Sequence, residues 1–131
     1  MKYFVMSKVE GLFGAPEFAR LLTHKWPDAQ LEWITDPDDN YSLEFRVPMK
    51  HSRVDGALDR EGSYVAFVGE LVDCAEFAGW CRTLVPPHEP LIFCDEGLSA
   101  RVNLEPRMTA PEILRAFHGA SSGPGPGSAP A

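Results

Sequence analysis

The fold class is decided by the stretch Tyr41-Ser42-Leu43-Glu44-Phe45-Arg46-Val47-Pro48, in which apolar and polar residues alternate with a period of two. Successive side chains of a β-strand point to opposite faces, so Leu43, Phe45 and Val47 are expected to face a core while their neighbours face water. A strand with one wet face is typical of antiparallel sheets. The sequence therefore predicts a strand over residues 41–48 in a mainly antiparallel sheet.

Other segments with strand character lie on both sides of this stretch. They are residues 3–9, 31–35, 53–58, 63–68, 91–94 and 98–104. The segment 53–58 is weakly patterned, which predicts a strand at the edge of the sheet. The segment 63–68 is apolar on both faces, which predicts a central strand.

Three segments show helical spacing of apolar residues. The first begins near Pro16 and ends before Pro27, since proline is accepted in the first turn of a helix but not in its interior. The second is expected to be capped by Asp73, with Glu76 three residues later, and the third begins with the capping-box pattern Thr109 to Glu112. An α+β fold with helices packed on the sheet follows.

The two halves of the chain resemble each other at an offset of about sixty residues. Glu17-Phe18-Ala19 returns as Glu76-Phe77-Ala78, and the acidic turn that begins at Asp36 is followed by a similar turn at Asp95. Each half reads strand, helix, strand, strand. This favours a pseudo-twofold arrangement of tandem β-α-β-β units, with the two acidic turns at equivalent ends of the sheet. Chance similarity between two such units is the alternative explanation.

The length of 131 residues suits one domain. We expect residues 1–118 to form a single globular domain. Residues 119–131 contain only Gly, Ser, Pro and Ala, which cannot bury enough surface to offset the entropy lost on ordering, so we expect this tail to be disordered.

The formal net charge of −7 bears on the class of partner. Direct binding to nucleic acid or to an anionic membrane surface requires Lys and Arg, so the composition argues against both. Six acids and no Lys or Arg lie between Asp28 and Glu44. A charged partner is therefore expected to be basic. Since the chain has no apolar stretch long enough for a membrane span, we expect a cytoplasmic protein.

No motif for catalysis stands out. The glycines form neither a dinucleotide fingerprint nor a phosphate loop, and no histidine stands at metal-ligand spacing from another ligand. Cys74 follows the expected helix cap, where a thiol can become reactive, and His88 is the histidine nearest to it in sequence. We expect no enzyme, no metal and no cofactor; an enzyme that uses Cys74 or a pair of carboxylates is a lesser alternative.

Clustered carboxylates next to aromatic side chains are suited to a partner that carries Lys and Arg. On this basis the expected partner-binding residues are Glu32, Asp36, Asp38, Asp39, Tyr41, Glu44, Asp95 and Glu96.

In size, acidity and architecture, residues 1–118 resemble the small immunity proteins of bacterial polymorphic-toxin and contact-dependent inhibition systems. The features that carry the resemblance are the acidic turn at residues 36–40, the hairpin at 91–104 and the capped helix at 109–117. The resemblance implies a cytoplasmic inhibitor that covers the active site or substrate groove of a cognate toxin, often a nuclease. These families share no universal motif, so the resemblance assigns no individual residue a role.

Two other functions fit the same sequence. A small-molecule-binding or regulatory module would use a cleft between the two halves, with the basic strip Arg46, Lys50, His51 and Arg53 facing an anionic ligand. A scaffolding subunit or homodimer would pair through an edge strand such as residues 53–58.

Overall fold

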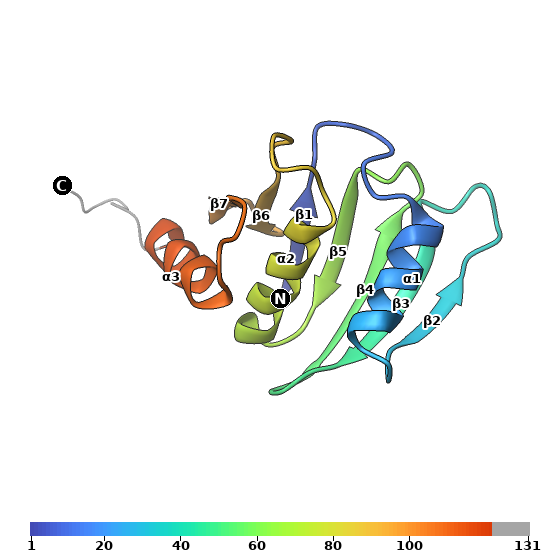
Figure 1. The fold of residues 1–131 in the computed structure, drawn as a ribbon, viewed down its shortest axis with the longest axis horizontal. Coiled ribbons are helices and arrows are strands. Elements are labelled where there is room, and N and C mark those ends of the chain that lie inside the picture. The colour runs from blue at the N-terminus through green and yellow to red at the C-terminus, as the bar shows by residue number, and fades with distance from the viewer. Residues whose placement is uncertain (122–131) are drawn as a thin grey trace.

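The computed structural model describes residues 1–121, which form one seven-stranded sheet and three helices (Figure 1). The elements are β1 Lys2–Met6, α1 Ala15–Lys25, β2 Gln30–Trp33, β3 Tyr41–Pro48, β4 Arg53–Asp59, β5 Tyr64–Val68, α2 Leu71–Thr83, β6 Ile92–Asp95, β7 Arg101–Asn103 and α3 Ala110–Ser121. The predicted α+β class with a mainly antiparallel sheet is confirmed.

Every neighbouring pair of strands is antiparallel, in the order β2-β3-β4-β5-β1-β6-β7. The connection β1-α1-β2 crosses three strands to reach one edge of the sheet, whereas β5-α2-β6 crosses only β1. Both halves thus contain a β-α-β-β unit. In the first unit the chain reaches the edge strand β2 and then turns back toward the centre with β3. In the second unit β6 lies next to β1, and β7 follows it at the opposite edge. The first strands of the two units, β1 and β5, are antiparallel neighbours, and this decides at which end of the sheet each acidic turn lies.

The strand β4 lies in the interior of the sheet, between β3 and β5, so the prediction of an edge strand at 53–58 was wrong. The weak apolar pattern of this segment has a packing cause. A Cβ at Gly56 would lie 2.5 Å from the carbonyl oxygen of Ala66 and 2.5 Å from Cζ of Phe45. The missing side chain makes room for the Phe45 ring. Pairing of two copies through residues 53–58 is therefore excluded, because both sides of β4 are already occupied.

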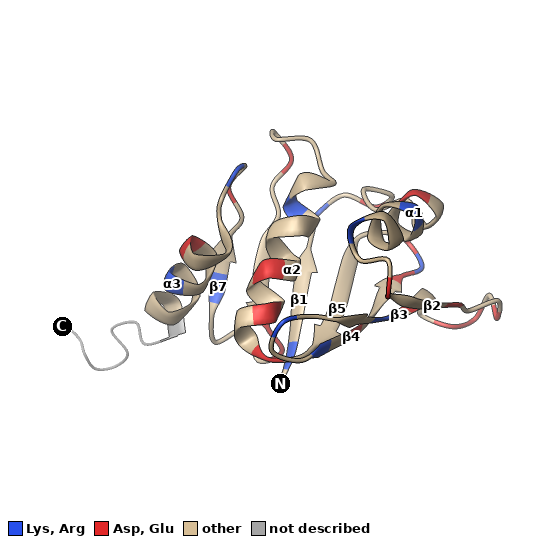
Figure 2. Ribbon diagram, turned by 60° about the horizontal axis from the view of Figure 1, so that its bottom comes forward, with Lys and Arg blue, Asp and Glu red and all other residues tan. Residues whose placement is uncertain are grey.

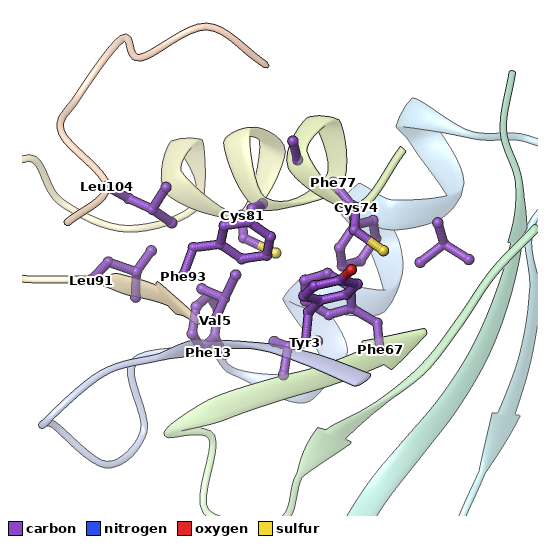
Figure 3. Packing of buried hydrophobic residues seen from close by; sticks show 14 of the residues in the cluster. Tyr3, Val5, Phe13, Phe67, Cys74, Phe77, Cys81, Leu91, Phe93 and Leu104 are labelled. Carbon is purple, nitrogen blue, oxygen red and sulfur yellow. The ribbon is translucent and has the colours of Figure 1, made fainter. Parts of the chain in front are cut away.

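All three helices cover the same face of the sheet, and aromatic side chains fill the space between the two layers. Phe77 of α2 contacts Phe45 of β3 and Phe67 of β5, with ring centroids 5.3 and 4.9 Å apart. Phe117 of α3 lies 5.1 Å from Phe93 of β6. Figure 3 shows Cys74, Phe77 and Cys81 of α2 pointing toward the strands that carry Tyr3, Phe67 and Phe93. The expected inward face of β3 is confirmed, since Leu43, Phe45 and Val47 are all buried.

The start of α2 differs from the prediction. The helix begins at Leu71, and Asp73 lies inside its first turn. Asp73 is 1 % exposed, and its carboxylate accepts hydrogen bonds from the backbone N–H of His51 at 3.0 Å and from the hydroxyl of Ser52 at 2.7 Å. Asp73 therefore joins the β3–β4 turn to α2 instead of capping the helix.

The capping box of α3 is confirmed. The Thr109 N–H donates to the Glu112 carboxylate at 2.8 Å, and the Glu112 N–H donates to the Thr109 hydroxyl at 3.3 Å. The helix continues to Ser121, so residues 119–121 are helical where a disordered tail was expected. The rest of that predicted tail, residues 122–131, lies outside the described residues.

Candidate functional site

The helices leave one face of the sheet uncovered, and we call this side the open face. On its central strands the side chains that point outward include Phe4 and Met6 of β1 and Tyr64 and Val68 of β5. Met6 and Val68 are 38 % and 39 % exposed. Contiguous exposed apolar side chains mark interaction surfaces more often than isolated ones do. The open face is therefore the first candidate for a binding surface.

Leu98 extends this apolar surface at the β6–β7 turn. It is 58 % exposed and has a φ of 58°, a left-handed backbone conformation that a branched side chain adopts only with strain. Together with Met6, Ile92 and Cys94 it lines a groove of about 240 Å³, which Lys8 and Arg101 flank. An exposed apolar residue held in a strained conformation is more typical of a functional surface than of a turn selected for stability.

A hollow of about 290 Å³ lies on the open face over β3, β4 and β5. Two small apolar residues, Ala57 and Ala66, stand directly opposite each other on β4 and β5 and form its floor. Their short side chains leave the space, and their methyl groups make the floor apolar. Its rim carries charges of both signs, namely Lys2, Glu44, Arg46 and Asp55. A rim of mixed sign does not favour an anionic ligand, and of the predicted basic strip only Arg46 lies there.

The predicted acids of the β2–β3 hairpin do gather at one corner of the sheet. Glu32 and Glu44 are directly opposite each other on β2 and β3, both exposed on the open face. Like charges at opposite positions destabilise a sheet. Among the described residues, neither carboxylate takes part in an ion pair. This acidic pair is therefore left for solvent or for a partner to neutralise.

The loop between these two strands holds Asp36, Asp38 and Asp39, and Arg60 from the β4–β5 turn fixes its shape. The Arg60 guanidinium donates to the carbonyl oxygens of Asp39 at 2.7 Å, Asp36 at 2.8 Å and Tyr41 at 2.7 Å. Because Arg60 binds carbonyl groups, the carboxylates of the loop are not its partners. Two of them make local turns: Asp36 accepts from the Asp38 N–H at 3.0 Å, and Asp39 from the Tyr41 N–H at 2.9 Å.

Tyr41 stands beside the acidic loop and contacts Tyr64, with ring centroids 6.1 Å apart. Burial, followed by the interaction with Tyr41, raises the pKa of Tyr64 to about 12. Tyr41 also lines the hollow. It connects the acidic corner to the central part of the open face, so the predicted Tyr41 lies with Glu32, Glu44 and the three loop aspartates.

Asp95 and Glu96 lie elsewhere. The Glu96 N–H donates to the carbonyl of Lys2 at the start of β1, whereas the β2–β3 loop contacts Arg60 at the end of the sheet where β1 finishes. The two acidic turns are thus at opposite ends of the sheet and roughly 25 Å apart across it, from the spacing of strands. The expectation that they lie at equivalent ends of the sheet is wrong, because β1 and β5, the first strands of the two units, run in opposite directions, and the two turns follow those directions.

Asp95 is also unavailable to a partner. It is 5 % exposed, and its carboxylate accepts hydrogen bonds from the hydroxyl and the N–H of Ser99, the latter at 2.8 Å. Burial tends to raise the pKa of Asp95, but the hydrogen bonds from Ser99 and Ala100 outweigh it and hold the pKa below its usual value. The prediction of Asp95 as a binding residue is therefore corrected to a role in forming the β6–β7 turn. The acids of the loop that joins β2 to β3, by contrast, lie at one corner of the molecule in Figure 2.

The alternative in which Cys74 is a reactive thiol gains no support. Burial and the neighbouring Asp73 raise the pKa of the Cys74 thiol to about 12, the reverse of what a reactive cysteine needs. Within residues 1–121 no three His, Cys, Asp or Glu side chains are placed to hold a metal ion, and no helix is long and apolar enough to cross a membrane.

Comparisons with known proteins give no relatives for this site: no family model matches the chain, no curated protein matches its sequence, and no solved structure matches it. The residues that the sequence reasoning missed are Arg60, Leu98 and the apolar residues of the open face. Phe4 directly follows Tyr3 in the sequence, and two adjacent aromatic residues in a strand predict that both faces of that strand are buried. Only the placement of every helix on one face makes Phe4 a surface residue.

Proposed function

We propose that this protein is a non-catalytic binding protein whose open face docks a basic protein partner. The observation that carries the proposal is the Glu32–Glu44 pair, two exposed carboxylates placed opposite each other without a cation from the described chain. The aspartates of the β2–β3 loop continue this acidic surface. A partner that brings Lys or Arg to this corner would remove the repulsion that the fold tolerates there.

The open face supplies the two components that a specific interface needs. Acidic side chains at the corner steer a basic partner and select its orientation, which affects the association rate more than the affinity. The apolar centre, which includes Tyr64, Val68 and the hollow over Ala57 and Ala66, offers surface that can be buried. We place Tyr41 between these two components as the anchor of the interface.

The partner that fits this description best is a toxin with a basic substrate groove, such as a nuclease. An acidic inhibitor competes with the nucleic acid for such a groove by presenting carboxylates where the phosphates would bind. In this proposal the protein is an immunity protein that acts in the cytoplasm.

The experiment is to express the chain together with the product of the gene immediately upstream, and to measure both rescue of growth and association kinetics. The test variant is Glu32→Gln with Glu44→Gln, and Glu96→Gln is the control because it is an exposed acid at the opposite end of the sheet. We expect the double variant to associate about tenfold more slowly at low salt and to lose part of the salt dependence. Equal rates for all variants, or rates independent of salt, would contradict the proposal.

A further inference from the structure

The strand β2 forms one edge of the sheet, and part of its backbone has no partner. The Ile34 N–H donates to the carbonyl of Ser42 at 2.9 Å, which fixes the alternation of the ladder with β3. Residues 30, 32 and 34 therefore direct their N–H and C=O groups toward β3, and the same groups of Leu31 and Trp33 point away from the sheet. Within residues 1–121 no other segment hydrogen-bonds to these outward groups.

This edge is four residues long and carries one charged side chain, Glu32, but it lacks the other usual protections against pairing. Proteins block exposed edges with proline, lysine, bulges or a covering helix. The β2 sequence Gln30-Leu31-Glu32-Trp33 contains neither proline nor lysine, and its register with β3 is regular. The opposite edge, β7, is only three residues long and packs against α3. Of the two edges, β2 is the one open to an added strand.

The side chains of β2 differ between the two faces. Glu32 stands beside Glu44 on the open face. Leu31 and Trp33 point to the helix side, where Leu31 packs partly against the core and Trp33 remains 50 % exposed. A strand added next to β2 would thus meet two carboxylates on one face and an exposed indole on the other.

We infer that β2 accepts an extended segment of the basic partner as an additional antiparallel strand, with Lys or Arg opposite Glu32 and an apolar residue opposite Trp33. This inference rests on the proposed function and specifies how the partner binds. The backbone groups of Leu31 and Trp33 supply hydrogen bonds, and the side chains of Glu32 and Trp33 supply selectivity, as in other complexes formed by strand addition.

A second copy of the chain fits this edge less well than a basic strand does. In antiparallel self-pairing around a twofold axis, residues on the same face must stand opposite each other. Glu32 then meets Glu32 of the other copy directly or diagonally, beside both Glu44 side chains. The same acidic pair that attracts a basic strand therefore opposes self-association.

The experiment selects short random peptides displayed on phage against the full chain, and then compares two variants. Leu31→Pro removes an outward N–H that β3 does not use, a change that edge strands tolerate. Leu31→Ala is the matched control, because it loses the side chain but keeps the N–H. We expect selected peptides to alternate basic and apolar residues, to bind Leu31→Ala nearly as well as the wild type, and to bind Leu31→Pro about tenfold more weakly.

Hydrogen exchange on the unmodified chain gives a readout that does not depend on how Leu31→Pro folds. Binding of a selected peptide should slow exchange at the amides of Leu31 and Trp33. Failure to select any peptide, equal binding to the two variants, or protection elsewhere without these two amides would overturn strand addition. If the selected peptides bind both Leu31 variants equally but lose affinity for Glu32→Gln with Glu44→Gln, strand addition is wrong and the proposed basic partner stands.

Discussion

Replacement of Arg60 by Met should destabilise the protein substantially, although Arg60 lies in a turn at the surface. Its Nε donates to the carbonyl of Asp39, and its Nη2 lies within 3.1 Å of the carbonyls of Ile34, Asp36 and Tyr41. Because Nη2 carries two hydrogens, the guanidinium makes three independent bonds to the β2–β3 loop. At about 1 kcal/mol for each bond, the loss is about 3 kcal/mol, which lowers Tm by roughly 10 °C.

The assay is urea unfolding followed by circular dichroism, with Arg53→Met as the control. Arg53 is a strand residue whose exposed side chain pairs, among residues 1–121, with Asp55 alone, so its replacement should leave the midpoint unchanged. Arg60→Lys separates charge from geometry, because a lysine keeps the positive charge but cannot reproduce the fork. A loss below about 1 kcal/mol for Arg60→Met, or full stability for Arg60→Lys, would refute the assigned role of the carbonyl bonds.

Three further predictions concern the packing of the sheet, its open face and its thiols. Gly56→Ala should lower the free energy of unfolding by about 2 kcal/mol, because the added Cβ would lie 2.5 Å from the Ala66 carbonyl oxygen and from the Phe45 ring. Gly97→Ala is the control and should be nearly neutral in urea unfolding, because no atom lies within 4 Å of its added Cβ. Equal effects of the two substitutions would contradict the packing argument. Leu98→Asn should raise stability by about 1 kcal/mol in thermal unfolding, since asparagine adopts the left-handed conformation more readily, and an unchanged Tm would argue against strain. Burial raises the pKa of Cys74 from 9.0 to about 12. The contribution of this thiol to stability is therefore present below pH 9 and lost as pH rises toward 12. When unfolding is measured at about pH 8 and about pH 11, Cys74→Ala should lose less stability at the alkaline pH than the wild type does.

Local patterns in the sequence predict the elements whose cause is local. The strand at residues 41–48 has the predicted bounds because the alternation of Leu43, Phe45 and Val47 is contained within it. The capping box of Thr109 is formed by residues three positions apart. The position of β4 was missed because Gly56 is required by the Phe45 ring on another strand, and no neighbour of Gly56 in the sequence carries that information.

The residues of the candidate site also fall into two groups, those placed by local sequence and those placed by distant contacts. The acids of the β2–β3 hairpin lie together because one short loop connects them, as the sequence suggested. Asp95 was placed incorrectly because its position depends on the order of the strands, and its burial depends on the fold of the β6–β7 turn. Arg60 has no local signal at all, since its acceptors lie 19 to 26 residues away. The open face could be recognised only after all three helices were found on the other side.

The position of β1 has a consequence for how the chain folds. This strand pairs with β5 and β6, so the centre of the sheet is closed by contacts between residues about sixty to ninety positions apart. Folding slows as the average separation of contacting residues grows, because loop entropy is lost before distant pairs are gained. We therefore expect β1 to remain unpaired during synthesis until residues 64–95 have followed it. A fragment that ends at β4 would leave β1 without either of its neighbours, so the two units are cooperative parts of one folding reaction.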